Sequence, residues 1–347
     1  MTKVWRAWRA LTFLLVLFIL GCAREPLISQ ESFVFGTRVE VLVYGAPPDT
    51  ARSAATAVLR EFDRLHRTYH AWQPSELTTL NDALAAGKPA EVSSELASLI
   101  RNAQQIAARS NYLFDPGIGR LISLWGFQND EFKAQPPDAA QLQIWRDAHP
   151  SLADLRVDGN RVVSRNKMVA LDFGGYLKGI ALDRGAAILK SHGVENALIN
   201  IGGNIIALGS KGGKPWRVAI QHPRSTAPLA TLDLRDGEAI GTSGDYQRYF
   251  ELDGKRYCHL LDPRTAEPVQ GTQAVTILIP PGVEAGMRSD ALSKPLFVAG
   301  AAWREQAQRL NVTQALRVDT AGTVYVTPAL RERLKFETPD LHVVTMP

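Results

Sequence analysis

The stretch that decides the fold reads Leu171-Asp172-Phe173-Gly174-Gly175-Tyr176-Leu177-Lys178-Gly179-Ile180-Ala181-Leu182-Asp183. A short apolar run, residues 168–171, ends at Asp172, and apolar residues recur at helical spacing after the two glycines. The pattern predicts a strand, a tight turn that uses the conformational freedom of glycine, and a helix. The unpaired N–H groups at such a helix start suit a ligand that carries phosphates, and Lys178 adds a mobile cation nearby. The alternative is an ordinary glycine turn that joins a strand to a helix.

A second glycine pair follows in the same half of the chain. Gly202-Gly203 lies between two apolar runs, residues 197–199 and 205–208. Because glycine permits close approach of the backbone, two such pairs indicate that close approach is needed at two places. This repetition favours a ligand site over two ordinary turns.

The first residues have the pattern of a secretory signal. Three basic residues precede an uncharged apolar segment at 10–20, which ends at Gly21-Cys22. The ending resembles the bacterial lipoprotein processing box, in which the cysteine becomes the lipid-modified first residue. We therefore expect a signal peptide over 1–22, lipidation of Cys22, and an exported chain anchored by lipid to a bacterial membrane on its periplasmic side. An uncleaved membrane anchor is the alternative, although the segment is short for a bilayer span.

The composition is that of an ordinary globular protein. The 347 residues are 45% hydrophobic, which is enough for one large domain or two intimately packed ones. The formal net charge of +4 includes the basic signal, so the exported part is closer to neutral, and this argues against a nucleic-acid surface. Cys22 and Cys258 are the only cysteines, so lipidation of Cys22 leaves no partner for an intramolecular disulfide.

After the signal, the sequence indicates a polar tether at 23–31 and one domain at 32–347. The predicted elements are a strand at 33–44, helices at 50–65, 75–81 and 93–110, a peripheral insertion at 129–149, two strands at 156–170 around Asp158-Gly159-Asn160, a helix at 179–191, strands at 216–220, 229–234 and 239–240, a hairpin around Asp253-Gly254, a strand at 274–279, a helix from Ser289 and a hairpin at 315–327. Strands and helices follow one another without internal repeats, which predicts an α+β fold of mixed sheets with packed helices.

Two further groups of side chains have both a functional and a structural interpretation. The aromatic residues at 69–72 precede a helix cap at Ser75, so they suit stacking on a ligand or packing in a satellite core. Asp290 lies at the predicted start of a helix, where a carboxylate either caps the helix or binds a metal. The residues alone do not choose between these interpretations.

Eight motifs occur in series along the chain. They are Phe35-Gly36-Thr37, Ser75-Glu76-Leu77, Phe114-Asp115-Pro116, Leu124-Trp125-Gly126-Phe127, residues 171–179, Ile201-Gly202-Gly203-Asn204, Thr242-Ser243-Gly244-Asp245 and His259-Leu260-Leu261-Asp262-Pro263-Arg264. In this order and spacing, from about Ser32 to Val326, they resemble the ApbE family of FAD:protein FMN transferases. The resemblance implies a single intertwined α+β domain of the flavin-transferase type. It also implies an enzyme that cleaves the FAD pyrophosphate with Mg²⁺, releases AMP and links FMN by a phosphoester to a threonine or serine of an acceptor protein. The implied acceptors are flavin-carrying subunits of membrane electron-transfer complexes.

The resemblance also assigns roles to individual residues. Those placed against FAD are Phe35, Trp72, Leu113, Phe114, Asp115, Asp172, Lys178 and Leu261, and those placed at the metal are the Gly175 carbonyl, Asp290 and the residue at position 294. The catalytic candidates are Asp172 and His259. His259 is the candidate base for the acceptor hydroxyl, because the ordinary pKa of histidine suits base catalysis near neutrality. A histidine packed in a hairpin is the structural alternative.

Two positions depart from the pattern of the family. Position 294 is Lys294, where the family usually has a threonine that binds the metal, and an ammonium has no lone pair for a cation. Two outcomes are open: Lys294 points away while Ser293 or water completes the metal shell, or its ammonium partly replaces the metal and weakens or changes the activity. Ala266 stands where the family commonly has glycine, and alanine resists a positive φ.

Because of the lysine, the sequence leaves other functions open. One is a lipoprotein that binds or delivers FAD without transferring FMN. Another is a plain substrate-binding lipoprotein with a cleft between two lobes, which would leave His259, Asp290 and the glycine pairs unexplained.

Overall fold

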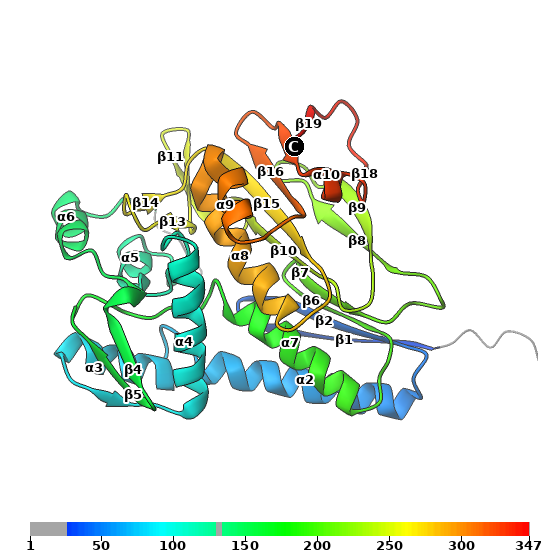
Figure 1. The fold of residues 1–347 in the computed structure, drawn as a ribbon, viewed down its shortest axis with the longest axis horizontal. Coiled ribbons are helices and arrows are strands. Elements are labelled where there is room, and N and C mark those ends of the chain that lie inside the picture. The colour runs from blue at the N-terminus through cyan, green and yellow to red at the C-terminus, as the bar shows by residue number, and fades with distance from the viewer. Residues whose placement is uncertain (1–25, 130–133, 347) are drawn as a thin grey trace, which may run out of the picture.

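A nine-stranded sheet runs through the centre of the molecule (Figure 1). The computed structural model describes residues 26–129 and 134–346, so the predicted signal peptide and Cys22 lie outside the described residues. In spatial order the strands are β1 (Leu27–Val34), β2 (Thr37–Tyr44), β6 (Ala197–Ile201), β7 (Asn204–Leu208), β10 (Ala239–Gly244), β15 (Thr272–Ile279), β16 (Ala315–Asp319), β17 (Val324–Val326) and β19 (Val343–Thr345). Neighbouring strands are antiparallel, except that β17 and β19 are parallel. Strands from both ends of the described chain share this sheet, which confirms the predicted intertwined α+β fold.

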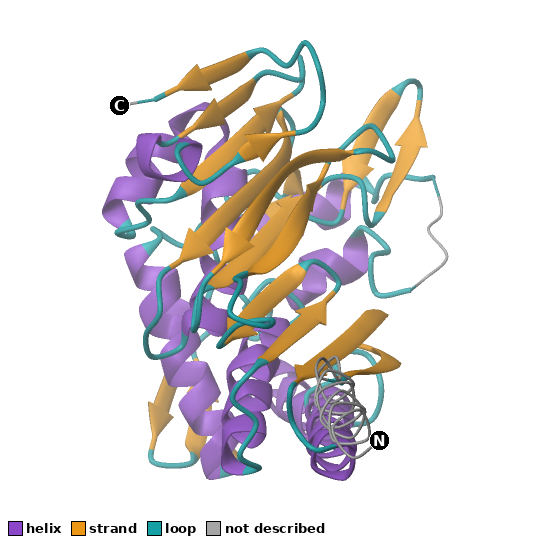
Figure 2. Cartoon of the chain, turned by 90° about the vertical axis from the view of Figure 1, so that its right-hand side faces the viewer, coloured by secondary structure: helices purple, strands orange, loops and turns teal. Residues whose placement is uncertain are grey.

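Helices cover one face of the sheet, and Figure 2 shows them (purple) mainly to one side of the strands (orange). The covering helices are α2 (Pro48–Thr68), α7 (Leu177–Ser191), α8 (Ala285–Ala299) and, after the short η2 (Gly300–Ala302), α9 (Trp303–Arg309). The helix α2 buries residues at helical spacing, namely Ala51, Ala54, Ala55, Val58, Phe62 and Leu65. The helix α8 packs on β10 and β15 and is buried almost all round, so even its polar residues Ser289, Asp290 and Ser293 lie inside the protein.

A small sheet covers part of the other face. Its strands are β8 (Trp216–Gln221), β9 (Pro228–Leu234) and β18 (Lys335–Phe336), with α10 (Pro328–Arg331) beside them. The strand β8 alternates buried and exposed residues, as a strand with one face on a core must. Its buried residues share an apolar cluster with residues of β6, β7, β10, β15 and β16. The central sheet is therefore buried on both sides there.

The remaining elements lie at one end of α2, at the left in Figure 1. One group comprises α3 (Glu76–Ala86), β3 (Ala90–Glu91), α4 (Ser94–Arg109), η1 (Leu152–Asp154), β4 (Leu155–Asp158) and β5 (Arg161–Ser164); the other comprises α5 (Gly119–Leu124), α6 (Ala139–Ala148), β11 (Tyr249–Leu252), β12 (Lys255–Cys258), β13 (Leu261–Asp262) and β14 (Glu267–Pro268). Among the described residues, no helix combines the length and apolarity that crossing a bilayer requires.

Two glycines let α7 and α8 cross in direct contact. A Cβ atom at Gly179 would lie 2.6 Å from the carbonyl oxygen of Gly286 and 2.6 Å from the Cα atom of Met287. A Cβ atom at Gly286 would lie 2.7 Å from the Cβ atom of Leu182. Asp183 on α7 strengthens the crossing, because its carboxylate accepts the N–H groups of Gly286 and Met287 at 2.8 Å each. The start of α7 is thus held against the first turns of α8.

Most predicted helices and hairpins are confirmed, but the first strand is not a single one. The chain turns at Phe35-Gly36, where both residues have positive φ (57° and 69°), so the region is a hairpin of β1 and β2. Residues 27–31, predicted as tether, already belong to β1. The reason is that an alternating strand pattern continues through a two-residue turn without a break that the sequence pattern would reveal.

Two other boundaries also differ from the prediction. The run 168–171 forms no strand, because the chain there makes only an isolated parallel bridge between Ala170 and Ile118. The helix predicted from Ser289 begins at Ala285, after Glu284. Asp290 therefore lies inside α8, and the interpretation of Asp290 as a helix cap is wrong.

Ala266 adopts the strained backbone that glycine would adopt without cost. Its φ is 61°, and its methyl group is fully buried. Hydrogen bonds on both sides hold it there, because its N–H donates to the carbonyl of Asp262 at 2.9 Å and its carbonyl accepts the indole N–H of Trp125 at 2.9 Å. The neighbouring interactions therefore stabilise the unfavourable conformation.

Candidate active site

The turn before α7 buries a carboxylate with one unpaired oxygen. Asp172 is 6% exposed, and its Oδ1 accepts the N–H of Gly174 at 2.7 Å. Its Oδ2 is buried and has no hydrogen-bond partner among the described residues. Burial raises the pKa of this carboxyl, while the Gly174 N–H, the charge of Arg248 and the nearby indole N–H of Trp72 act in the opposite direction. The Trp72 indole does not meet the geometry of a hydrogen bond to Oδ2. Because a buried acceptor without a partner is costly, this oxygen indicates a place for a donor from a ligand.

The two glycine pairs serve different needs. Neither Gly174 nor Gly175 has a positive φ, so the prediction that this pair is used for its torsional freedom is wrong. A Cβ atom at Gly174 would lie 3.0 Å from Asp172 Oδ1, and one at Gly175 would lie 3.3 Å from Lys294 Cε, so a side chain at either position would be tight and would require its neighbour to shift slightly. Gly202 and Gly203 do have positive φ (57° and 93°) and make the tight turn between β6 and β7.

The fully buried Asp290 joins the start of α7 to α8 and the central sheet. Its Oδ2 accepts the N–H of Gly179 at 2.9 Å, and its Oδ1 accepts the side-chain amide of Asn204 at 3.2 Å. Lys294, one turn further along α8, donates its ammonium to the same Oδ1 and to the Asp290 carbonyl at 2.8 Å. Burial alone would raise the pKa of the Asp290 carboxyl, but the charges of Lys294 and Lys178 lower it overall. Asp290 is therefore an ionised carboxylate inside the protein.

Lys178, Arg248 and Lys294 gather beside these carboxylates. Burial lowers the pKa of Lys178, the charges of Lys294 and Arg248 lower it further, and Asp290 opposes them. The guanidinium of Arg248 donates to the carbonyls of Phe127 at 2.7 Å and Asn129 at 3.0 Å. Three cations near two carboxylates leave a net positive site, which suits an anionic ligand.

His259 follows the end of β12 and faces this positive charge. Its Nδ1 lies 3.1 Å from the carbonyl oxygen of Arg248, which requires a proton on Nδ1 and leaves Nε2 as an acceptor. Burial lowers the pKa of His259 to about 3, and the charges of Arg248, Lys178 and Lys294 contribute. His259 is thus neutral at physiological pH, whereas the sequence had suggested an ordinary pKa. The structure makes it a proton acceptor in a cationic environment.

The hairpin that carries His259 rests on stacked aromatic rings. The rings of Phe250 and Tyr257 lie 5.0 Å apart at an interplanar angle of 10°, and Trp125 stacks on Tyr257 at 5.8 Å. Phe127 contacts the imidazole of His259 edge-on at 6.4 Å. The motif at 124–127 therefore holds the hairpin in place.

A row of rings leads along α2 toward the site. Phe35 lies 5.6 Å from His66, His66 lies 4.9 Å from His70, and His70 lies 5.8 Å from Trp72. The guanidinium carbon of Arg248 lies 5.6 Å from the centre of the Trp72 ring, which is 37% exposed. Trp72 is thus accessible for stacking, whereas Phe35 lies at the far end of the row and packs against Phe62 at 6.1 Å. Their roles toward FAD stay predictions.

The other predicted FAD residues are buried. Leu113, Phe114 and Leu261 all belong to apolar clusters. Asp115 accepts hydrogen bonds from the hydroxyl of Ser151 at 2.6 Å and the N–H of Gly117 at 2.8 Å, and burial raises its pKa to about 6. These contacts tie the loop after α4 to η1. The predicted contacts of these residues with FAD remain untested.

Arg248 and Ser243 are site residues that sequence reasoning missed, whereas Ser293 was named only as a possible metal ligand. The hydroxyls of Ser243 and Ser293 lie 2.7 Å apart, and Ser293 also donates to the carbonyl of Asp290 at 2.8 Å. Arg248 follows the motif at 242–245 within a run of polar and aromatic residues, and that run was the signal that could have identified it. An arginine on a surface hairpin is common, so only its position beside His259 and Trp72 shows its importance.

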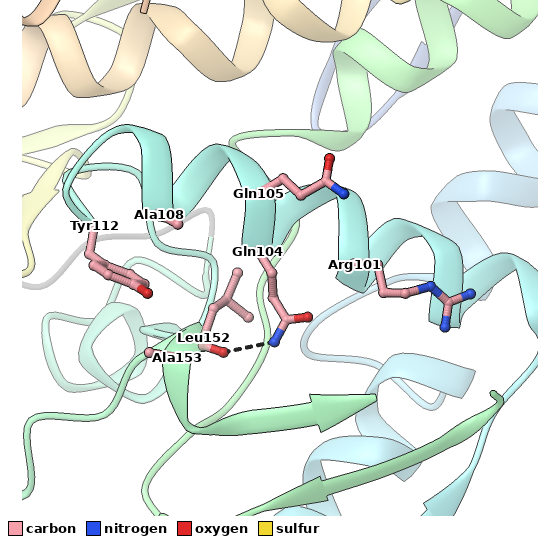
Figure 3. A pocket seen from close by; sticks show the side chains of 7 residues that line it. All are labelled: Arg101, Gln104, Gln105, Ala108, Tyr112, Leu152 and Ala153. Atoms are coloured by element: carbon pink, nitrogen blue, oxygen red, sulfur yellow. Dashed lines mark hydrogen bonds between the residues drawn. The ribbon is translucent and has the colours of Figure 1, made fainter. Parts of the chain in front are cut away.

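A hollow of about 400 Å³ opens elsewhere, along α4 (Figure 3). It contains none of the predicted site residues, and the amide of Gln104 inside it donates to the carbonyl of Leu152 at 3.0 Å. The residues that line it are Arg101, Gln104, Gln105, Ala108, Tyr112, Leu152 and Ala153. We place the site at the start of α7 because the unpaired carboxylate and the cations lie there.

Both the sequence and the fold are similar to those of known proteins. A model of the ApbE family matches residues 35–316. An FAD:protein FMN transferase of Rhodobacter capsulatus is 40% identical over 90% of this chain, which spans 59% of that relative's length. An FAD:protein FMN transferase of Klebsiella pneumoniae is 32% identical over 82% of this chain and 81% of its own length.

Two solved structures illustrate the similarity of the fold. The crystal structure of the ApbE protein from Thermotoga maritima matches with a TM-score of 0.81 and 31% identity, over 89% of this chain and 99% of that one. The flavin transferase ApbE from Vibrio cholerae matches with a TM-score of 0.78 and 25% identity, over 89% of this chain and 100% of that one.

Proposed function

The chain belongs to the ApbE family, and on that premise we propose that it is an FAD:protein FMN transferase. In the proposed reaction the hydroxyl oxygen of an acceptor threonine or serine attacks the phosphorus of the FMN half of FAD. The bond from that phosphorus to the bridging oxygen breaks, and AMP leaves with that oxygen. The product is FMN joined to the acceptor by a phosphoester.

The observation that carries the proposal is the unpaired Asp172 Oδ2 close to a cluster of basic side chains and a neutral histidine. A carboxylate oxygen accepts N–H or O–H donors, such as the amino group of adenine, so Asp172 is suited to hold the nucleotide part of FAD. Lys178 and Arg248 face the place where a pyrophosphate would bring negative charge. Phosphoryl transfer depends mainly on such positioning and charge stabilisation.

His259 takes the proton of the attacking hydroxyl in this proposal. The Arg248 carbonyl holds Nδ1–H, so the lone pair of Nε2 accepts the proton as the new phosphorus–oxygen bond forms. A pKa of about 3, lowered first by burial and then by nearby cations, makes a weak base, and a bound pyrophosphate would neutralise the cationic part of that effect. FAD binding is therefore expected to strengthen His259 as a base.

The predicted magnesium site does not fit the residues as they stand. The structure brings Gly175, Asp290 and Lys294 together, but the Lys294 ammonium pairs with the Asp290 carboxylate that would bind the metal. Among the described residues, no three histidine, cysteine or acidic side chains converge on a possible metal position. We therefore derive no step through Mg²⁺.

The proposed partners and location come from the sequence and the family. Cys22 would carry the lipid that anchors the chain to a bacterial membrane on the periplasmic side, and the acceptors would be flavin-carrying subunits of membrane electron-transfer complexes. The near-neutral charge of the exported part supports a function without nucleic acid. A second candidate, an FAD carrier without transferase activity, is favoured by one observation, the Lys294–Asp290 pair.

The test incubates the full-length chain in detergent with FAD and a peptide that carries a flavinylation-type threonine, with and without Mg²⁺. Peptide mass and AMP release are measured together. A peptide that gains one FMN for each AMP released is the expected result. FAD bound without AMP or labelled peptide would contradict the transferase and favour the carrier. No FAD binding at all would contradict both.

A further inference from the structure

The side chain of Lys294 lies mostly buried within the site. Its side chain is 13% exposed, and its ammonium contacts both the carbonyl and the carboxylate of Asp290. The stem of the lysine passes over Gly175, where a Cβ atom would lie 3.3 Å from Lys294 Cε. The lysine stem therefore packs in van der Waals range of Gly175, and a side chain at that position would have to push the stem aside slightly. An exposed surface lysine would need no such contact.

The carboxylate that faces Lys294 is held rigidly and charged. Asp290 is fully buried, and its two oxygens also accept the Gly179 N–H and the Asn204 amide. A buried carboxylate without a cation would be strongly unfavourable, so the ammonium is its charge partner. Each carboxylate oxygen already has at least one donor from the protein.

We propose that the Lys294 ammonium is the resident cation of this site, in the place where the family resemblance implies a divalent metal ion. This inference rests on the proposed function, because it assigns the positive charge that a pyrophosphate would meet there. Lysine binds phosphate as a point charge, and Lys178 on α7 adds a second one nearby.

A divalent ion has little to bind while Lys294 is present. Magnesium and manganese require oxygen ligands, and the ammonium offers no lone pair and repels the ion. Replacing Lys294 with threonine would remove that charge, leave the Asn204 amide as the donor to Asp290 Oδ1, and add a hydroxyl oxygen. The neighbouring Gly175 carbonyl would then be available as a further oxygen ligand.

The experiment measures Mn²⁺ binding to the full-length chain in detergent, without nucleotide, from the electron paramagnetic resonance signal of free Mn²⁺. The wild type, Lys294→Thr and Lys294→Gln are compared. The matched control is Lys190→Thr, because Lys190 is an exposed lysine in the last turn of α7. We expect weak binding to the wild type and to the control, and a dissociation constant lower by about tenfold or more in Lys294→Thr.

The double variant Asp290→Asn with Lys294→Thr should lose the gained binding, because the charged ligand is gone. Circular dichroism checks that each variant is folded. Mn²⁺ binding to the wild type as tight as to Lys294→Thr would overturn the proposal. If the threonine variant does not fold, the wild type is compared with Lys294→Gln in the same way.

The FMN-transfer assay on the same samples, with EDTA or Mg²⁺, separates this inference from the proposed function. Transfer by the wild type in EDTA is expected, with a gain in Mg²⁺ dependence in Lys294→Thr. If no variant transfers FMN but Lys294→Thr still gains Mn²⁺, the proposed function fails while the assignment of the resident cation stands.

Discussion

Asp172 offers a ligand one buried oxygen that the protein itself leaves unpaired. In Asp172→Asn, Oδ1 can still accept the Gly174 N–H, but the second position becomes an N–H donor that cannot accept from a ligand. We expect FAD to bind roughly tenfold to a hundredfold more weakly, since an unmade buried hydrogen bond costs about 1–3 kcal/mol. Equilibrium fluorescence titration with FAD measures this. The control is Asp49→Asn at the exposed start of α2, which should leave FAD binding unchanged.

His259 is predicted to matter for transfer and not for FAD binding. In His259→Ala we expect FAD binding close to that of the wild type and transfer slower by about a hundredfold or more, because a positioned general base contributes on that order. In the enzyme without substrate the pKa of His259 is about 3. Its protonation should therefore cause no fall in kcat/KM as the pH drops through 6.5. Rates measured from pH 5 to 8 test both points. Unchanged transfer in the alanine variant would remove His259 as the base.

Arg248 connects three parts of the site through one residue. Its carbonyl faces the imidazole of His259, and its guanidinium lies over Trp72 and holds the carbonyl of Phe127. Removing its charge in Arg248→Gln should raise the pKa of His259, because Arg248 is one of the cations that lower it, beside burial, Lys178 and Lys294. Titration of the imidazole signals by NMR measures the shift.

The matched control for Arg248→Gln is Arg256→Gln. Arg256 lies on the same hairpin but stacks on Tyr249 at 3.9 Å and pairs with Glu251 at 2.8 Å, away from His259. Its loss should not move the pKa of His259. Equal shifts in the two variants would show that the hairpin as a whole, rather than Arg248, sets that pKa.

At the scale of elements, the crossing of α7 and α8 sets the geometry of the site. It brings the Gly179 N–H to Asp290 and the start of α7 to the ammonium of Lys294. In Gly179→Ala the added methyl would overlap backbone atoms of Gly286 and Met287, so the helices must move apart. We expect the free energy of unfolding to fall by about 1–3 kcal/mol, the usual cost of overpacking.

Urea unfolding measures this change in Gly179→Ala. The control is Gly282→Ala, because a Cβ atom there would meet nothing within 4 Å and the backbone has no positive φ. Equal stability of the two variants would show that the crossing tolerates a side chain.

At the scale of the whole molecule, an ion-pair network joins helices that are distant in sequence. Arg64 on α2 donates to Glu95 on α4 at 2.8 and 3.0 Å, and Arg184 on α7 pairs with Glu61 at 2.9 Å and also with Glu95. Burial alone would raise the pKa of Glu95, but Arg64, the hydroxyl of Tyr69 and Arg184 lower it from 4.5 to about 2. The ionised Glu95 therefore contributes its full stabilisation of the folded state above about pH 4.5, and this stabilisation is lost as the pH falls toward 2.

In Glu95→Gln there is no carboxylate to protonate at this position. The free energy of unfolding of this variant should therefore fall less than that of the wild type as the pH drops from 5 to 2. Thermal or urea unfolding across that range measures the difference. The exposed Glu332 provides the control, because Glu332→Gln should keep the acid sensitivity of the wild type. An identical pH dependence of all three proteins would show that the network does not stabilise the fold.

The sequence by itself determined most elements and the family. Helical spacing at 50–65 and 93–110 predicted α2 and α4, and the glycine turns at Gly159 and Asp253-Gly254 predicted hairpins that the structure confirms. Such signals are local, because spacing and turn residues act within a few positions along the chain. The motif series needed only order and spacing, so the family membership could also be predicted.

The way in which the site residues act on one another follows from the packing of distant segments. The interior position of Asp290, the ion pair with Lys294 and the lowered pKa of His259 all depend on contacts between α7, α8, the central sheet and the β11–β12 hairpin. The close contact between Gly179 and Gly286 also depends on tertiary packing, because the residues next to each glycine in the sequence do not indicate that another helix crosses there. Burial and charge proximity arise when distant segments pack, so a local sequence pattern does not contain them.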